Sequence, residues 1–351
     1  MNQTVMIEAY GDTTGDRTTA LEHVFEWMQP QGLQGKRILL LTGNVPGDPA
    51  VLQRAVELCR EAGHIDIGIQ SLGEWPAAAR RTMEALIAPY GRVIEYGGGE
   101  YESLEVPSRL VAGTRHRLET NEKRYLKQVF VARCLAEADL IGVVRMVELN
   151  RFSGIHGFFA TILDCVPTRT RTEVLSYASY GMMGEALLDV YSAIRGRFLF
   201  GVLDGHHVIE ETFGDTADTR FIIAGIDPDE LDAYALIASG SRVSYSPFSN
   251  PAQARLGKGR RGASPDVVLN VRLDDLRARI PSEFVRAPII RSAFRSLPNL
   301  RFSACPVDFD TLVCPTGAIE LGENGVPAVR RAACVGCGWC LRVWREVTLA
   351  R

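Results

Sequence analysis

Short apolar runs alternate with amphipathic segments along the first part of the chain, and this alternation predicts an α/β fold. The apolar runs predict strands at Thr4–Tyr10, Arg37–Thr42, Ile65–Gln70 and Val93–Tyr96. Apolar residues at helical spacing lie between these strands and predict helices at Thr18–Met28, Asp48–Ala62 and Trp75–Ala88. Asp48 stands at an N-cap position, and Gly63 at the position that follows a last turn. Such an order is typical of a mainly parallel sheet with flanking helices.

The same alternation continues through the middle of the chain. It predicts strands at Asp139–Val144, Phe198–Leu203 and Thr219–Ala224 and helices at Gly181–Ile194 and Asp229–Ala238, with Asp227 as a cap. The polar stretch Glu100–Lys127 is interpreted as an excursion or a β-ribbon, and Ser241–Arg272 as a loop. Three prolines precede the cysteine-rich tail, so we expect residues 1–298 to form the α/β domain and residues 299–351 a second, smaller one.

Composition narrows the class of protein. The chain has 351 residues, of which 46% are hydrophobic and 23% charged, as expected for a soluble globular protein. The net charge of −3 gives no reason to expect a nucleic acid as partner. No apolar run is long enough for a membrane span, and the polar N-terminus does not resemble a signal peptide. We therefore expect a cytoplasmic protein with reduced thiols and no membrane partner.

The cysteines are concentrated at the end of the chain. Five of the eight lie in the last 47 residues, where Cys334, Cys337 and Cys340 form a C-x2-C-x2-C triplet. Such a triplet supplies three thiolates to one metal cluster, and a distant cysteine followed by proline supplies the fourth. Cys314, followed by Pro315, has that form. A zinc site and a thioredoxin-like redox pair are the alternatives, but neither matches this spacing well.

The segments CPTGAIEL and CVGCGWC resemble one half of a ferredoxin-type 4Fe-4S domain. The resemblance implies one 4Fe-4S cluster per chain, held by Cys314, Cys334, Cys337 and Cys340. A second cluster would need three more cysteines before Cys314, where this chain has Ala304, Val307 and Asp310. Cys305 is interpreted as an apolar filler or a thiol near the cluster rather than as a ligand.

The larger part of the chain resembles the family called domain of unknown function 362. The clearest similarity is AGIDPDELDA, at Ala224–Ala233, with weaker likeness over roughly residues 35–260. Members of that family often end in a ferredoxin-type segment. The family also commonly carries a Lys-x-Lys-Thr-His run after the central strand, whereas this chain has Met146–Asn150 without lysine or histidine there. A ligand held by those basic residues in relatives is therefore not expected here.

Three polar residues are the candidates for a catalytic site. Asn44 and Asp204 each follow a predicted strand, at the edge where open α/β sheets bind ligands, although both also suit turns. The family resemblance implies that His156, after Gly154, lies where the central helix begins; there it either faces a site as an acid or base, or is a surface or N-terminal helix residue. The adjacent His206 and His207 are expected to point to opposite faces of an extended strand, which disfavours metal binding by the pair.

The expected function is an iron–sulfur oxidoreductase that acts on a small molecule and passes electrons through the C-terminal cluster. A ferredoxin or a reductase would then be its redox partner. One alternative is an electron-transfer module that docks on a partner enzyme. Another is a non-redox enzyme whose cluster acts as a Lewis acid, which requires an iron without a cysteine ligand. The sequence does not identify the substrate.

Overall fold

The fold was analysed in a computed structural model of the whole chain. The residues it describes are 5–11, 13–43, 48–70, 81–82, 84–85, 87–96, 100–106, 126, 128–149, 155–167, 170, 174, 180–210, 215–239, 267–269, 275, 279–280, 300–306, 318–330 and 347–349. These ranges contain the central sheet and its helices. They also contain four short strands of the C-terminal segment.

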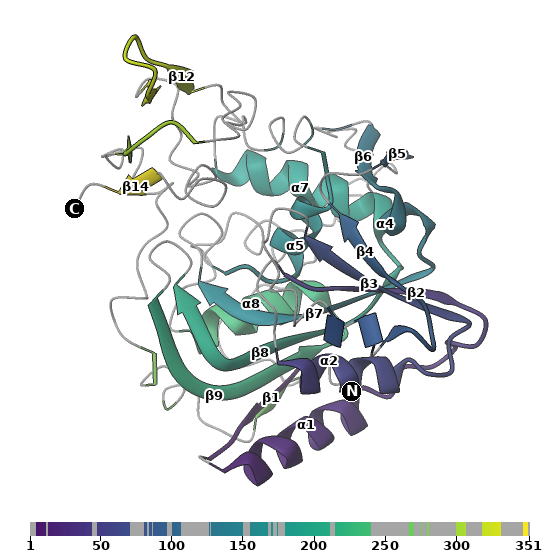
Figure 1. Ribbon diagram of the computed structural model, residues 1–351. Helices are drawn as coiled ribbons and strands as arrows, with labels where there is room; N and C mark the ends of the chain where they lie inside the picture. Colours follow the sequence, from purple (N-terminus) through teal and green to yellow (C-terminus); the bar gives the residue numbers. More distant parts are fainter. Residues whose placement is uncertain are drawn as a thin grey trace, which may run out of the picture.

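An eight-stranded sheet forms the centre of the molecule, in the order β10-β1-β9-β8-β7-β2-β3-β4 (Figure 1). Strand β9 runs antiparallel to both of its neighbours, β1 and β8. The other pairs are parallel, so β1, β2, β3, β4, β7 and β8 all point the same way. The predicted α/β fold with a mainly parallel sheet is therefore confirmed.

The first half of the chain supplies three strands at one edge of the sheet, one strand near the other edge, and the helices of one face. Its elements are β1 (Val5–Ala9), α1 (Thr14–Met28), β2 (Arg37–Leu41), α2 (Pro49–Leu58), β3 (His64–Gln70) and β4 (Val93–Tyr96). Each predicted strand is confirmed to within one or two residues. Helix α1 begins four residues earlier than predicted, because Thr13 and Asp16 form a capping box. Asp48 caps α2 as predicted, but α2 ends at Leu58, before the predicted stop at Gly63. Most of the helix predicted at Trp75–Ala88 lies outside the described residues.

The middle of the chain supplies the longest strands. They are β7 (Leu140–Leu149), β8 (Phe198–Glu210) and β9 (Asp215–Gly225), and each extends several residues beyond its apolar centre. Figure 1 shows β8 and β9 bending together as a curved ribbon. The helices here are α4 (Arg133–Glu137), α5 (Phe158–Asp164), α7 (Tyr180–Ile194) and α8 (Pro228–Ala238). Asp227 caps α8, accepting hydrogen bonds from the backbone N–H groups of Asp229 and Glu230.

Two hydrophobic cores, one on each face, hold the helices to the sheet. Helices α1 and α2 pack on one face against alternate residues such as Ile38 and Leu40 of β2. Helices α4, α5, α7 and α8 cover the other face, where Leu39 and Leu41 point (Figure 1). Alternate residues of a strand point to opposite faces, so both faces of β2 are buried, as is usual for a parallel sheet.

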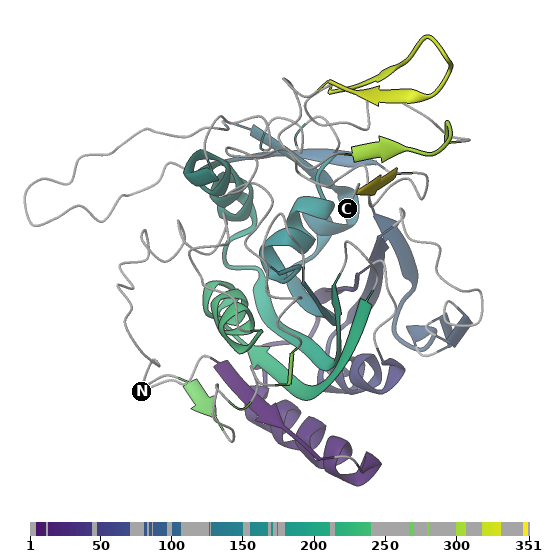
Figure 2. The ribbon, with the colours of Figure 1, turned by 90° about the vertical axis from the view of Figure 1, so that its left-hand side faces the viewer.

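Two further parts of the chain form smaller strands. Strand β5 (Tyr101–Glu105) pairs with β6 (Gln128–Ala132), so the start of the polar excursion is a β-ribbon. Strand β10 (Val267–Leu269) joins the main sheet beside β1, within a stretch expected to be loop. The C-terminal strands are β11 (Leu300–Phe302), β12 (Ile319–Leu321), β13 (Pro327–Val329) and β14 (Val347–Leu349) (Figure 2). Strand β11 pairs with β14 and β12 with β13. The division at residue 298 stays a prediction.

Candidate functional site

The carboxyl ends of the parallel strands meet at one edge of the sheet, and charged side chains gather there on both of its faces. Ligands of open α/β proteins bind at this edge. Two of the predicted site residues, Asp204 and His156, lie among the described residues. The third, Asn44, lies outside them. Asp204 and His156 belong to two separate groups of contacting side chains, which we call the Asp204 cluster and the His156 cluster.

The Asp204 cluster consists of Tyr10, Arg17, Asp48, Asp204 and His206. Arg17, from the first turn of α1, donates through Nη2 to Asp204 Oδ2 at 2.9 Å and through Nη1 to Asp48 at the start of α2. The other oxygen of Asp204 accepts a hydrogen bond from the backbone N–H of His206 at 2.9 Å. Tyr10 Oη lies 2.9 Å from His206 Nδ1. One arginine therefore joins the starts of α1 and α2 to the middle of β8.

Burial dominates the electrostatics of the Asp204 cluster. It raises the pKa of Asp204, against the opposing effect of the Arg17 guanidinium. It also raises the pKa of Tyr10, so the phenol is neutral near pH 7. Burial lowers the pKa of His206, and the nearby Arg17 cation lowers it further, which favours the neutral imidazole. Two carboxyl groups, one guanidinium and neutral ring donors and acceptors thus share this part of the edge.

The His156 cluster lies on the opposite face and is fully buried. Arg145, from β7, donates to Thr161 Oγ1 at 2.7 Å and to Glu148 Oε1 at 2.9 Å. His156 Nε2 lies 2.7 Å from Asp164 Oδ2, and its Nδ1 is 3.6 Å from Glu148 Oε2. A carboxylate bonded to one ring nitrogen fixes the tautomer and orientation of a histidine. The ring of His156 is 0% exposed, so the prediction of a surface residue is wrong for this position.

Strand β7 separates the two clusters. Met146 of β7 pairs with Asp204 of β8, while the preceding Arg145 points to the face of α5. Asp204 instead contacts α1, on the face of α1 and α2. The two predicted site residues Asp204 and His156 therefore lie on opposite faces of the sheet and do not share one site.

Sequence reasoning missed most members of both clusters. Arg145 and Glu148 carry a visible signal, because they are charged residues within the otherwise apolar run LIGVVRMVEL. Gly43, two residues after the end of β2, gives a second one: a Cβ there would lie 2.7 Å from Arg145 Nη2. Arg17 and Tyr10 carry no local signal, since only the packing of α1 and β1 against β8 and β9 brings them to Asp204.

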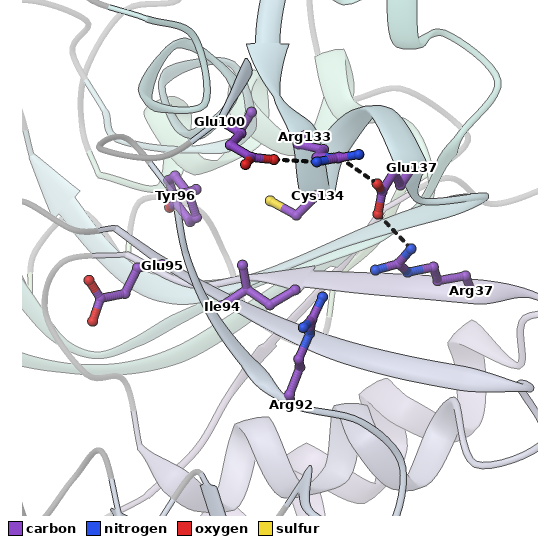
Figure 3. Close-up of a pocket in the computed structure, with 10 residues that line it drawn as sticks. Arg37, Arg92, Ile94, Glu95, Tyr96, Glu100, Arg133, Cys134 and Glu137 are labelled. Atoms are coloured by element: carbon purple, nitrogen blue, oxygen red, sulfur yellow. Dashed lines mark hydrogen bonds and ion pairs between the residues drawn. The ribbon is translucent and has the colours of Figure 1, made fainter. Parts of the chain in front are cut away.

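A cavity of about 300 Å³ lies elsewhere, between the β5–β6 ribbon, α4 and the edge strand β4 (Figure 3). A chain of ion pairs runs along it from Glu100 through Arg133 and Glu137 to Arg37 (Figure 3). Burial raises the pKa of Cys134 in its wall to about 11, which keeps this thiol protonated and weakly nucleophilic. Arg133 and Arg37 of this wall are thus already paired with carboxylates, and we assign no site to the cavity.

The four cysteines predicted to bind the cluster lie outside the described residues. The strands between them are described, and the backbone N–H of Arg330 donates to Ala318 O at 2.7 Å at the open end of the β12–β13 pair. Cys305, after β11, is exposed, so its interpretation as an apolar filler is wrong.

The sequence profile of the family described as domain of unknown function (DUF362) matches residues 43–236, which is more than half of the chain. The chain belongs to the DUF362 family. The matched part of this DUF362 protein contains Asn44, His156 and Asp204, whereas the cysteine triplet lies beyond it.

Among solved structures, the lactate racemase apoprotein from Thermoanaerobacterium thermosaccharolyticum is similar to this DUF362 protein, with 12% sequence identity and a TM-score of 0.39. The similarity covers 68% of this chain and 57% of that one, so the chain matches little more than half of that protein's length. No curated protein matches it. Within the described ranges, none of the helices has the length and apolar character that crossing a membrane requires.

Proposed function

We propose that this protein is an iron–sulfur oxidoreductase that acts on a small molecule and exchanges electrons through one C-terminal 4Fe-4S cluster. The observation that carries the proposal is the spacing of the cysteines. Cys334, Cys337 and Cys340 form a C-x2-C-x2-C triplet, and Cys314 precedes a proline. Four thiolates in this arrangement suit a cubane cluster, which supplies one-electron transfer when bound. A ferredoxin or a reductase is the redox partner that this chemistry requires.

The strands around the cysteines support the proposed ligand set. Pairing of β12 with β13 sets Ala318 beside Arg330. Cys314 lies four residues before Ala318 in sequence, and Cys334 four residues after Arg330. The two segments that carry the proposed ligands therefore leave the same end of one strand pair. Pairing of β11 with β14 also joins the beginning and end of the cysteine-bearing segment. Both pairings are compatible with ligands drawn from distant positions in sequence.

The α/β part would then bind the small molecule at the carboxyl edge of its sheet. The Asp204 cluster supports this assignment, because it gathers charged and ring side chains at the edge where such folds bind ligands. Asp204 accepts from Arg17 and from the backbone of His206, so both of its oxygens are held in place. Fixed polar groups of this kind orient a ligand, whereas a simple electron carrier needs none.

The decisive experiment is iron and sulfide analysis with electron paramagnetic resonance of the full chain purified without oxygen. We expect about four irons and four sulfides per chain, and a signal that appears with dithionite. Cys314→Ala should lower the iron content or change that signal. Cys305→Ala is the matched control, since Cys305 is an exposed cysteine of the same segment, and it should leave both unchanged.

Three results would overturn the proposal or part of it. Zinc in place of iron would leave a structural tail and no redox centre. An unchanged signal in Cys314→Ala would remove Cys314 from the ligand set and favour the Lewis-acid alternative, with one iron open to substrate. A fully ligated cluster in a chain whose carboxyl edge binds no small molecule would favour the electron-transfer module.

A further inference from the structure

We propose that His206, His207 and Asp218 form a binding site for a divalent transition-metal ion, separate from the cysteine segment. One ring nitrogen of each histidine and one carboxylate oxygen of Asp218 all lie within 4.8 Å of one another. Ligand atoms bound to one zinc ion lie about 2.0–2.2 Å from it, and therefore about 3–4 Å from one another. Small side-chain rotations are enough to close the site.

An irregularity in the sheet explains how two adjacent histidines reach one site. Strand β8 pairs with β9 regularly up to Gly205 and Phe221, and the next pair is His207 with Asp218. One residue of β8 therefore faces two of β9, Thr219 and Arg220, which is a β-bulge. The two histidine rings lie with their centroids only 4.3 Å apart. The expectation that they point to opposite faces is therefore wrong, and with it the argument against a metal site.

The backbone at the bulge is held in an unusual conformation. Arg220 has a φ of 55°, in the left-handed region that residues other than glycine rarely adopt. Three contacts hold this position: the N–H of Tyr10 donates to Arg220 O at 3.1 Å, and the Arg279 guanidinium donates to Thr219 O and Arg220 O. Backbone of this kind persists only where surrounding contacts enforce it, and such positions cluster at active sites, ligand clamps and switch regions.

Tyr10 orients the first histidine of the proposed site. Its hydroxyl lies 2.9 Å from His206 Nδ1, and the two rings are stacked with an angle of 13° between their planes. This contact occupies Nδ1, so we assign Nε2 as the metal ligand. Histidine ligands in metal sites are usually fixed in this way through their other nitrogen. Tyr10 is thus a positioning residue, which would not itself touch the ion.

The type of ligand indicates the type of ion. Two imidazoles and one carboxylate suit zinc and neighbouring first-row metals, whereas calcium and magnesium prefer oxygen ligands. Three protein ligands leave at least one coordination position for water or an oxygen atom of a bound molecule.

The test uses the full chain whose C-terminal cysteines already hold their metal centre. This protein is titrated with Zn²⁺ by calorimetry. We expect one additional binding event, weakened at least tenfold in His207→Ala and in Asp218→Asn. Both side chains are exposed, so neither change should disturb the core. His64→Ala is the matched control, because His64 is a part-exposed histidine paired with Asp66 on β3, and it should bind as wild type does. Tyr10→Phe should weaken binding by about tenfold through loss of orientation.

Two further measurements separate this site from the cysteines. The Co²⁺ complex should lack the charge-transfer absorption of thiolate ligands. Arg220→Asn should strengthen binding, since Arg220 forms an ion pair with Asp218 and asparagine tolerates a positive φ. Equal Zn²⁺ affinity in wild type and His207→Ala, or thiolate absorption from the added Co²⁺, would overturn the proposal. Neither result depends on whether the cysteine centre contains iron.

Discussion

Arg17 is the residue whose loss should most disturb the carboxyl edge, and Arg17→Met tests this. The guanidinium joins Asp48 at the start of α2 to Asp204 in the middle of β8. Methionine keeps much of the length of the side chain but leaves both carboxyl groups without their cation. Only 5% of the Asp204 side chain is exposed, so water cannot replace that partner. The variant should therefore be destabilised even though Arg17 lies outside the hydrophobic core.

The expected size follows from the burial of the pair. Removal of one partner of a buried ion pair costs about 3–5 kcal/mol, because the remaining charge is left unpaired. Arg17 itself is 16% exposed and Asp48 is 29% exposed, which places the cost near the lower limit, at about 3 kcal/mol. Arg17→Met removes the cation of the pair, whereas Asp204→Asn removes the buried carboxylate. A double-mutant cycle of Arg17→Met with Asp204→Asn should give a coupling free energy of about 1.5–3 kcal/mol.

Urea denaturation at pH 7 measures each free energy of unfolding, and Arg54→Met supplies the control. Arg54 of α2 also pairs with Glu22 of α1, and with Glu57 within α2, but these side chains are 42–49% exposed. Its removal should cost between 0 and about 1 kcal/mol. The destabilisation by Arg17→Met should shrink as the pH falls, since burial raises the pKa of Asp204 and protonation removes the uncompensated charge. Equal losses for the two arginines, or a coupling near zero, would refute the argument.

Three other predictions concern single residues. Burial raises the pKa of Asp232 to about 7, although hydrogen bonds from the backbone N–H groups of Phe159 and Phe158 act to lower it. The carboxyl group therefore binds a proton more tightly in the folded protein than in the unfolded chain. The free energy of unfolding measured by urea denaturation should therefore fall by about 4 kcal/mol as the pH rises from about 4 to about 7. Asp232→Asn should abolish this dependence on pH. Gly43→Ala should cost about 1–3 kcal/mol in thermal unfolding, because its Cβ meets the Arg145 guanidinium at 2.7 Å. Iodoacetamide near pH 7 should label exposed Cys305 well before Cys134, whose pKa of about 11 keeps it protonated, as peptide mass mapping would show.

Each of these predictions has a clear contrary result. A constant difference between wild type and Asp232→Asn from pH 4 to pH 8 would mean that the hydrogen bonds from α5 outweigh burial and keep the carboxyl charged. Normal stability of Gly43→Ala would mean that Arg145 has room to move. Equal labelling of Cys134 and Cys305 would mean that the wall of the cavity opens readily.

Central strands of the sheet such as β2 could be predicted because they are buried on both faces and are therefore continuous apolar runs. The four residues ILLL of β2, Ile38–Leu41, form such a run, and polar residues flank it on both sides. The ends of β8 and β9 could not be predicted in this way. There the strands continue through polar residues such as His207 and Asp218, so their pairing depends on the partner strand rather than on apolar pattern.

The candidate sites show the same division. The cysteine triplet could be singled out as the proposed cluster site because its three cysteines are close in sequence and their spacing is typical of such sites. Arg17 and Asp204 are 187 residues apart, and no local pattern joins them. The alternation rule failed for His206 and His207 because it assumes a regular strand, whereas β9 carries one extra residue opposite them. A positive φ at an arginine leaves no recognisable mark in the sequence.

The antiparallel strand β9 is what makes the Asp204 edge different from the rest of the sheet. A parallel neighbour would lead away from this edge through a helix, whereas β9 returns from it directly beside β8 and brings Asp218 opposite His207. Its extra residue also lets Arg220 O accept from the N–H of Tyr10, which ties β1 to the same point. The chemistry proposed for the edge therefore depends on the bulge itself. Deletion of one residue at positions 219–220 should restore regular pairing and turn the two histidines to opposite faces. Zn²⁺ binding should then be lost while the sheet remains folded, and a protein that kept both would show that the bulge is not what forms the site.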